Sequence, residues 1–136
     1  MYKMSMIVRY SRIFSDRKLK KYDMNFGEEV IVMYLAANSG INQEAIAKHF
    51  MIDKGAIAKS INRLEEKQYI IKKQNPDNKR ENLLWLSEKG MEIIEEMRGI
   101  LEEWNALLYK DMTEEEVETV NGLIDRMAGN VIEEVR

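Results

Sequence analysis

The stretch that decides the fold covers residues 42–67 and reads NQEAIAKHFMIDKGAIAKSINRLEEK. Asn42 and Asp53 are helix-capping residue types, and each precedes a segment whose apolar residues recur at helical spacing. The run Phe50-Met51-Ile52 between these segments is too apolar to face water entirely, which predicts a turn packed against a core. A helix, a short turn and a longer helix form a helix-turn-helix, which we expect over about residues 42–67.

The second of these helices, expected from Lys54 to about Lys67, has one apolar and one basic face. Ile57, Ile61 and Leu64 are spaced to dock on the rest of the fold. The opposite arc carries small and basic side chains that suit base edges and phosphates in a DNA major groove. We expect DNA contacts from Lys54, Gly55, Ala56, Lys59, Ser60 and Arg63. The alternative is an ordinary solvated helix face, because lysine and arginine are mostly exposed in any protein.

After this helix the period of the apolar residues changes. Tyr69-Ile70-Ile71 and Leu83-Leu84-Trp85-Leu86 are short β-prone runs, and they flank a polar segment from Lys72 to Asn82 with a turn at residues 75–78. We therefore predict a two-stranded wing with a long loop over about residues 69–86. Its Lys79 and Arg80 would lie along phosphates or enter a minor groove. Lysines that protect an edge strand from aggregation are the alternative.

Helices are expected on both sides of this region. The first covers about residues 3–20, and a capping box of Asn25 and Glu28 opens a second that runs to about Asn38. Ser87 begins a long helix to about Lys110, and Thr113 with Glu116 forms another capping box that opens the last helix. The order of elements predicts a mainly α (α+β) fold.

The two C-terminal helices carry apolar residues at intervals of 3, 4, 3 and 4. The positions are Ile94, Met97, Leu101, Trp104 and Leu108, followed by Val117, Val120, Ile124, Met127 and Val131. Two such seams exceed what one small domain needs, so we expect them to pack against a second subunit. The alternative is that both helices cover the core of their own chain.

Composition and charge exclude several classes of function. The 136 residues suit one domain, there is no cysteine and only one histidine, and no apolar run is long enough for a membrane span. We expect a cytoplasmic protein without a secretory signal, metal or cofactor. No P-loop, nucleophile elbow or glycine-rich nucleotide turn is present, so we do not expect an enzyme.

The charge of the chain is unevenly distributed. The net charge is −3, yet residues 1–21 hold seven basic residues and one acid, and residues 48–80 hold nine and four. Residues 87–136 hold five basic residues and fourteen acids. Because DNA responds to the local field, the low total charge is compatible with DNA binding through the basic middle of the chain.

Residues 42–50 and 53–65 resemble the helix-turn-helix of the MarR family, and Tyr69-Ile70 with the segment from Arg80 to Gly90 resembles its wing and its Leu-Thr-Glu-Lys-Gly exit. The likeness covers nearly the whole chain. It implies a single winged helix-turn-helix domain over residues 1–136, with the winged part at 27–86 and dimerisation helices at 1–22 and 87–136. It also implies a homodimer on a pseudo-palindromic operator in double-stranded DNA, with recognition helices in successive major grooves.

The chain departs from the family pattern at three places. Gly55-Ala56 stands where the family usually has serine or threonine, so hydroxyl contacts to DNA are missing there. Asn78 stands where an aspartate commonly precedes the wing arginine by two residues, although Asp77 is adjacent. This leaves open whether a wing carboxylate braces Arg63. Ser87 replaces the usual threonine, which is nearly neutral for an N-cap.

The resemblance further implies a ligand-responsive regulator, expected here to be a repressor that a small aromatic or lipophilic effector relieves. Such a molecule would bind between the dimerisation helices and the DNA-binding lobe. Candidate pocket residues are Tyr10, Phe14, Met33, Tyr34, Met97 and Trp104. At helical spacing these side chains also suit an ordinary core. A winged-helix protein-interaction module that does not read DNA sequence is the alternative function.

Overall fold

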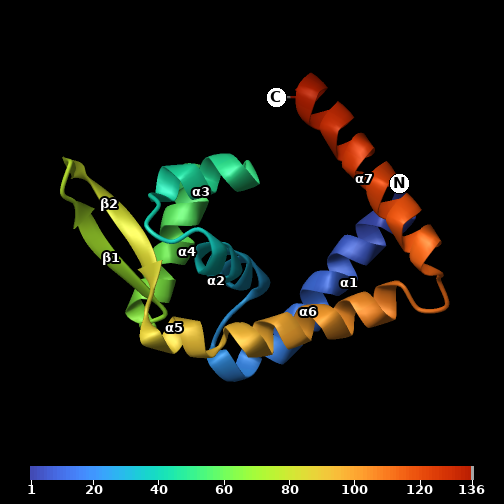
Figure 1. Cartoon of the computed structure of the whole chain (residues 1–136), viewed down its shortest axis with the longest axis horizontal. Helices are drawn as coiled ribbons and strands as arrows, with labels where there is room; N and C mark the ends of the chain where they lie inside the picture. Colours follow the sequence, from blue (N-terminus) through green and yellow to red (C-terminus); the bar gives the residue numbers. More distant parts are fainter. Residues whose placement is uncertain (136) are drawn as a thin grey trace. The chain divides into compact units, whose positions relative to one another are not determined.

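A computed structural model describes residues 1–135, and its elements follow the predicted order (Figure 1). The predicted single domain, which extends to residue 136 outside the described part, groups by contacts into two compact units divided after Leu101. The first unit holds α1 (Tyr2–Leu19), the 3-10 turn η1 (Lys20–Tyr22), α2 (Phe26–Ala37), α3 (Gln43–Phe50), α4 (Lys54–Glu66), β1 (Ile70–Asn75), β2 (Asn78–Leu86), α5 (Glu88–Glu92) and the start of α6 (Ile94–Leu108). The second unit holds the rest of α6 and α7 (Glu114–Val135). Within residues 1–135, no helix has the length and apolar character needed to traverse a lipid bilayer.

The helix-turn-helix begins and ends at the predicted capping residues. The side chain of Asn42 accepts a hydrogen bond from the backbone N–H of Ala45 at 2.7 Å, and Asp53 accepts one from Ala56 at 3.1 Å. Between the helices, Met51 takes a left-handed conformation with φ 52° that reverses the chain. Each cap satisfies an N–H group that has no partner inside its helix, so both predicted N-termini are confirmed.

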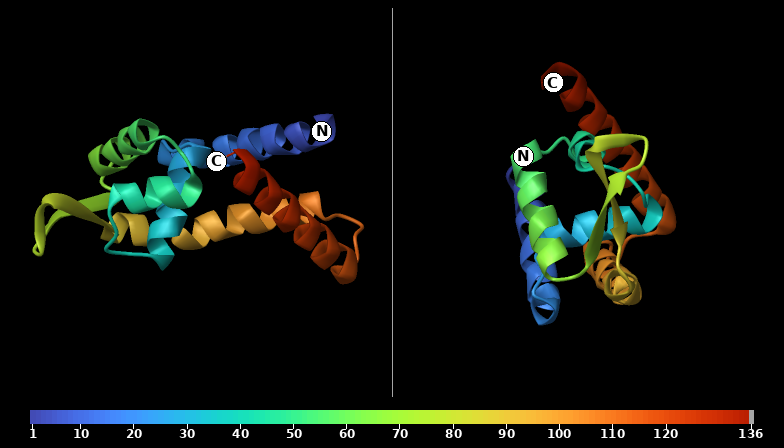
Figure 2. Two further views of the ribbon diagram at one scale, coloured as in Figure 1. Left: turned by 90° about the horizontal axis from the view of Figure 1, so that it is seen from above. Right: turned by 90° about the vertical axis from the view of Figure 1, so that its left-hand side faces the viewer.

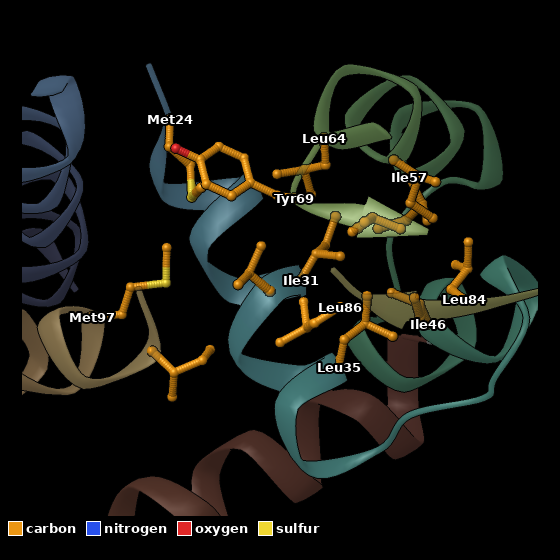
Figure 3. Close-up of a cluster of buried hydrophobic side chains, with 14 of the residues drawn as sticks. Met24, Ile31, Leu35, Ile46, Ile57, Leu64, Tyr69, Leu84, Leu86 and Met97 are labelled. Carbon is orange, nitrogen blue, oxygen red and sulfur yellow. The ribbon is translucent and has the colours of Figure 1, made fainter. Parts of the chain in front are cut away.

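The core of the first unit forms around α2. Ile31 and Leu35 project from α2 among side chains of α3, α4 and the sheet, and Met97 of α6 lies on another side of the same helix (Figure 3). Ile57, Ile61 and Leu64 are all buried, which confirms the predicted docking face of α4. Burial of these side chains fixes the position of α4 on the core, so the opposite face of the helix stays in solvent.

The strands of the hairpin are longer, and its loop shorter, than the sequence suggested. The strands pair from Ile70 with Leu86 out to Gln74 with Asn82, and a register irregularity follows before Asn75 meets Asn78. Only residues 76 and 77 remain for the turn, so the predicted long loop was wrong. The tip closes because the Asn75 side chain accepts a hydrogen bond from Asp77 N at 3.0 Å. Figure 2 shows the hairpin projecting beyond the helices next to it.

An isolated β-bridge ties the root of the hairpin to the segment that leads into the helix-turn-helix. Leu84 N donates to Ile41 O at 2.8 Å, and Gly40 N donates to Leu84 O at 2.8 Å. Gly40 takes φ 74°, a conformation that side chains rarely allow. The segment that leads into α3 is therefore joined to the two-stranded sheet of the wing by backbone hydrogen bonds.

The single helix expected from Ser87 to about Lys110 is divided in two, which corrects that prediction. Ser87 caps α5 as expected, through a 3.0 Å bond from Gly90 N. A Cβ on Gly90 would lie 2.3 Å from the carbonyl oxygen of Tyr69, so α5 rests directly on backbone. Ile94 and Met97 of α6 must instead reach the core. The helix is interrupted at Ile93, between the turn that rests on the backbone of Tyr69 and the turn that reaches the core.

In the second unit, the predicted capping box opens α7. Thr113 N donates to Glu116 Oε2 at 2.8 Å, and Glu116 N donates to Thr113 Oγ1 at 3.2 Å. Tyr109 then donates its hydroxyl to Asn121 Oδ1 at 2.7 Å. No residue of α7 is buried among the described part of the chain, although its seam is apolar. Ile124 and Met127 are each 45% exposed.

Candidate nucleic-acid interface

The start of α4 presents the small residues that the sequence placed there. Lys54, Gly55, Ala56 and Lys59 are exposed, and Ser60 is half-buried on the same helix. A Cβ on Gly55 would lie 2.9 Å from Oδ2 of the capping Asp53. Glycine therefore leaves room for the cap as well as exposing the backbone. The helix begins with an open surface that admits a base-pair edge.

The two lysines of this surface differ in their environment. Lys54 Nζ lies 2.7 Å from Glu44 Oε1 of α3, and its hydrogen bond and charge hold the pKa of Glu44 below the usual value. Lys59 has no ion-pair partner within residues 1–135. Because both members of the Lys54 pair are exposed, the pair adds little to stability. Among the described residues, Lys59 is the basic side chain of α4 without an ion pair.

Arg63 lies farther along α4, and its partner was not foreseen from the sequence. Its Nε lies 2.9 Å from Oε1 of Glu28 in the first turn of α2, whereas the sequence left open whether a carboxylate of the wing braces it. Glu28 was recognised only as half of a capping box, a role it does have, since its Oε2 accepts from Asn25 N at 3.2 Å. The available signal was the pair of basic residues Arg63 and Lys67, one turn apart on a helix that docks on α2.

Two of the four basic residues of the wing lie near its tip. Lys79 and Arg80 are exposed at the start of β2, and neither has an ion-pair partner among the described residues. Gln74 Nε2 of β1 donates to Lys79 O at 2.7 Å, which ties the backbone that carries these two side chains to β1. The hairpin therefore presents two free positive charges on a fixed backbone.

Glu81 is a second carboxylate whose contacts the sequence did not reveal. It accepts hydrogen bonds from Asn42 and, at 2.6 Å, from Asn75, and these bonds hold its pKa below the usual value. Asn42 is the N-cap of α3, so Glu81 links the wing to the helix-turn-helix. No local pattern in the sequence indicates a bond between residues 39 positions apart.

Helix-turn-helix and wing together enclose a polar cavity of about 390 Å³. The start of α3, the start of α4 and both strands contribute its walls, which include Lys54, Lys72 and Arg80. Lys72 also lies 3.0 Å from Glu65, so part of this charge is balanced within the protein. Glu44 and Glu81 also line the cavity, so its three basic side chains, on α4, β1 and β2, lie beside two carboxylates.

The six side chains predicted for a ligand pocket are distributed over several environments. Met97 is fully buried in the core, Tyr10 is half exposed, and Trp104 belongs to the second unit. Phe14, Met33 and Tyr34 pack against the core from its edge. A different set of residues lines a cavity of about 580 Å³ between α1, α2 and α4, among them Arg12, Phe26, Phe50, Ala56 and Ser60.

The exposed, basic N-terminus of α4 lies beside a basic hairpin, and both elements pack on the same hydrophobic core. This arrangement defines the winged helix-turn-helix class of DNA-binding transcriptional regulators. The MarR family model matches residues 27–82. The transcriptional regulator YybA of Bacillus subtilis is 29% identical, with 93% of this chain and 84% of YybA aligned.

Two solved structures extend the comparison. The crystal structure of MarR is 32% identical, with a TM-score of 0.85 over 96% of this chain and 88% of that one. A MarR family regulator from Listeria monocytogenes, solved in complex with a 26mer DNA, is 27% identical, with a TM-score of 0.91 over 97% and 88%. The chain belongs to the MarR family, which confirms the predicted resemblance and fold class.

Proposed function

We propose that this protein binds a pseudo-palindromic operator as a homodimer, represses transcription there, and releases the operator when a small ligand binds. The observation that carries the proposal is the exposed start of α4 next to Lys79 and Arg80, which have no ion-pair partner among the described residues. Separate α4 helices of a dimer would occupy successive major grooves, because half-sites repeat about every helical turn.

Different residues of this surface are suited to different contacts. Gly55 and Ala56 let the backbone approach base edges, and Lys59 is long enough to bond a guanine. Lys54 and Ser60 at the borders of the surface, together with Lys79 and Arg80 of the wing, suit phosphates or a minor groove. In this assignment α4 reads sequence, whereas the wing supplies affinity.

Self-association is supported by the apolar seam of α7. Leu123, Ile124, Met127 and Val131 are between 45% and 60% exposed along one helix. A second copy is a suitable occupant because the basic segment 1–21 and the acidic segment 87–136 have complementary charge. Burial of these four side chains in a dimer removes an exposed apolar stripe from water.

The cavity between α1, α2 and α4 is our candidate effector site. Its walls combine Phe26 and Phe50 with the charged Arg12 and Asp16, which suits an aromatic molecule with a polar group. Ala56 and Ser60 of α4 also line it, so a ligand there would favour one position of α4 over another. The six side chains predicted from the sequence remain candidates for further apolar contacts.

The test of DNA binding is selection of duplexes from a random pool by the purified protein, followed by a salt titration of the selected sequence. We expect an enriched near-palindrome whose affinity falls steeply as salt rises. Lys110→Ala, which removes an exposed charge from the second unit, is the matched control for variants of the wing. Absence of enrichment, with uniformly weak binding, would favour a protein-interaction module instead.

Repression and its relief need two further measurements. Placing the selected sequence upstream of a reporter should lower expression when the protein is present, and an activator would raise it. Aromatic acids that protect the protein against thermal unfolding are then added to the DNA complex. If a saturating ligand leaves the DNA affinity unchanged, the proposed switch is wrong.

A further inference from the structure

Glu28 is a carboxylate in an unusual position, because its side chain is only 1% exposed. Charged groups are seldom buried unless they are paired. Here Oε1 lies 2.9 Å from Arg63 Nε, and Oε2 lies 3.1 Å from Lys67 Nζ and 3.2 Å from the N–H of Asn25. One side chain of α2 thus contacts its own helix cap, the third turn of α4 and the residue that follows α4.

The contact with Arg63 is close but incompletely aligned. Arg63 Nε and Glu28 Oε1 form an ion pair at 2.9 Å, yet the N–H does not point squarely at the oxygen, and neither atom has another hydrogen-bond partner among residues 1–135. A guanidinium is rigid and carries five N–H groups, so anchoring Nε restricts the plane that holds the other four. The Arg63 side chain is 43% exposed, which leaves those donors in reach of a ligand.

The place of Arg63 along α4 indicates which part of DNA it meets. The N-terminal residues of a recognition helix contact base edges, and Arg63 is in the third turn of a helix that begins at Lys54. A guanidinium in the third turn of α4, beside α2, is suited to a backbone phosphate. A phosphate can accept two parallel N–H bonds from it.

We propose that Glu28 is a positioning residue of the DNA-binding surface, which orients the Arg63 guanidinium toward one backbone phosphate. The proposal rests on the function proposed above. Lys67, which also donates to the carbonyl oxygen of Asp23, keeps the Glu28 carboxylate in place from its other side. Glu28 acts through Arg63 and does not itself contact DNA.

The experiment is a double-mutant cycle on affinity for the selected duplex, measured at several salt concentrations. Glu28→Gln keeps the volume and the acceptor for Asn25 N but removes the charge that attracts Arg63. We expect Arg63→Ala to weaken binding about tenfold and to lower the salt slope by about one ion. Glu28→Gln should weaken binding severalfold, and the double variant should bind within about twofold of Arg63→Ala alone.

Two variants separate positioning from general support of the fold. Arg63→Lys keeps the charge but loses the planar fork, so we expect the wild-type salt slope with about fivefold weaker binding. Lys67→Met removes the other cation from Glu28 and should lower the urea midpoint without changing the salt slope. These two variants leave Glu28 intact, so they test the proposal even if Glu28→Gln does not fold.

Several outcomes would overturn the proposal. They are additive losses in the cycle, tighter binding by Glu28→Gln, and wild-type affinity in Arg63→Lys. A folded wild-type protein that binds no duplex at low salt would overturn the proposed function together with this role. Duplex binding with additive losses would overturn the role of Glu28 alone.

Discussion

Glu29 adjoins Glu28 in α2 but has the opposite kind of environment. Its side chain is buried, and burial raises its pKa from 4.5 to about 7, opposed by a hydrogen bond from Ser15 and assisted by the charge of Asp16. Between pH 4.5 and pH 7 the native protein retains a proton that the unfolded chain has released. The free energy of unfolding therefore falls as pH rises through this window.

We expect Glu29→Gln to abolish this part of the pH dependence. Relative to the wild type, the variant should gain stability as pH rises from 4.5 to 7, up to about 3 kcal/mol, and then remain level. Urea unfolding at intervals from pH 4.5 to pH 8 measures the difference, with exposed Glu66→Gln as the control. Parallel curves for wild type and Glu29→Gln would contradict the assignment.

Gly90 offers a second test at the scale of one residue. A methyl group there meets the carbonyl oxygen of Tyr69 at 2.3 Å, so the backbone of α5 or of the hairpin must move. We expect Gly90→Ala to cost about 2 kcal/mol or more in urea unfolding. Gly99→Ala is the matched control, because a Cβ there meets nothing within 4 Å and α6 gains helix propensity. Equal effects of the two substitutions would refute the close approach.

At the scale of elements, substitutions in α4 and in the wing should change DNA binding in different ways. Lys59→Ala removes the unpaired cation of α4, and we expect it to change which duplexes are enriched in a repeated selection. Its affinity for the wild-type operator should fall by about 1–3 kcal/mol, with smaller losses on sequences altered at the contacted base. Equal losses on all duplexes would show that Lys59 does not read bases.

Arg80→Ala should weaken binding to every duplex by a similar factor and lower the salt slope by about one ion, because a phosphate or minor-groove contact carries little sequence information. The measurement is the slope of log affinity against log salt for the operator and for a scrambled duplex. Lys110→Ala should leave both slopes unchanged. An unchanged slope for Arg80→Ala would place the wing tip away from DNA.

Local signals predicted most elements, and long-range contacts account for what they missed. Capping residues such as Asn42 and Asp53 act within four positions, so their helices could be located from the sequence. The partner of Arg63 could not, because Glu28 precedes it by 35 positions and its local pattern already explained it as a cap. The hairpin turn was misjudged for a related reason, since polar strands near a tip lack the alternation that marks a half-buried strand.

For the whole molecule, the number of chains in the assembly decides whether one or two half-sites of the operator are bound. Ile124→Asp places a charge in the apolar seam of α7, where a second copy would bury it at considerable cost. We expect the variant to sediment as a monomer and to bind a single half-site weakly. Gly129→Asp introduces the same charge about 140° around the helix and should stay dimeric. A dimeric Ile124→Asp protein would place the interface elsewhere.

The bridge between Ile41 and Leu84 also bears on how such a protein can diversify. Because the hairpin is tied to the helix-turn-helix at Leu84 and at Glu81, residues added beyond Glu81, toward the tip, leave these contacts with the helices in place. Adding two residues to each strand keeps every side chain on its face and lengthens the reach by about 7 Å. Adding one residue exchanges the two faces. Evolution can therefore tune the span of the wing in steps of two, independently of the surface that reads the operator.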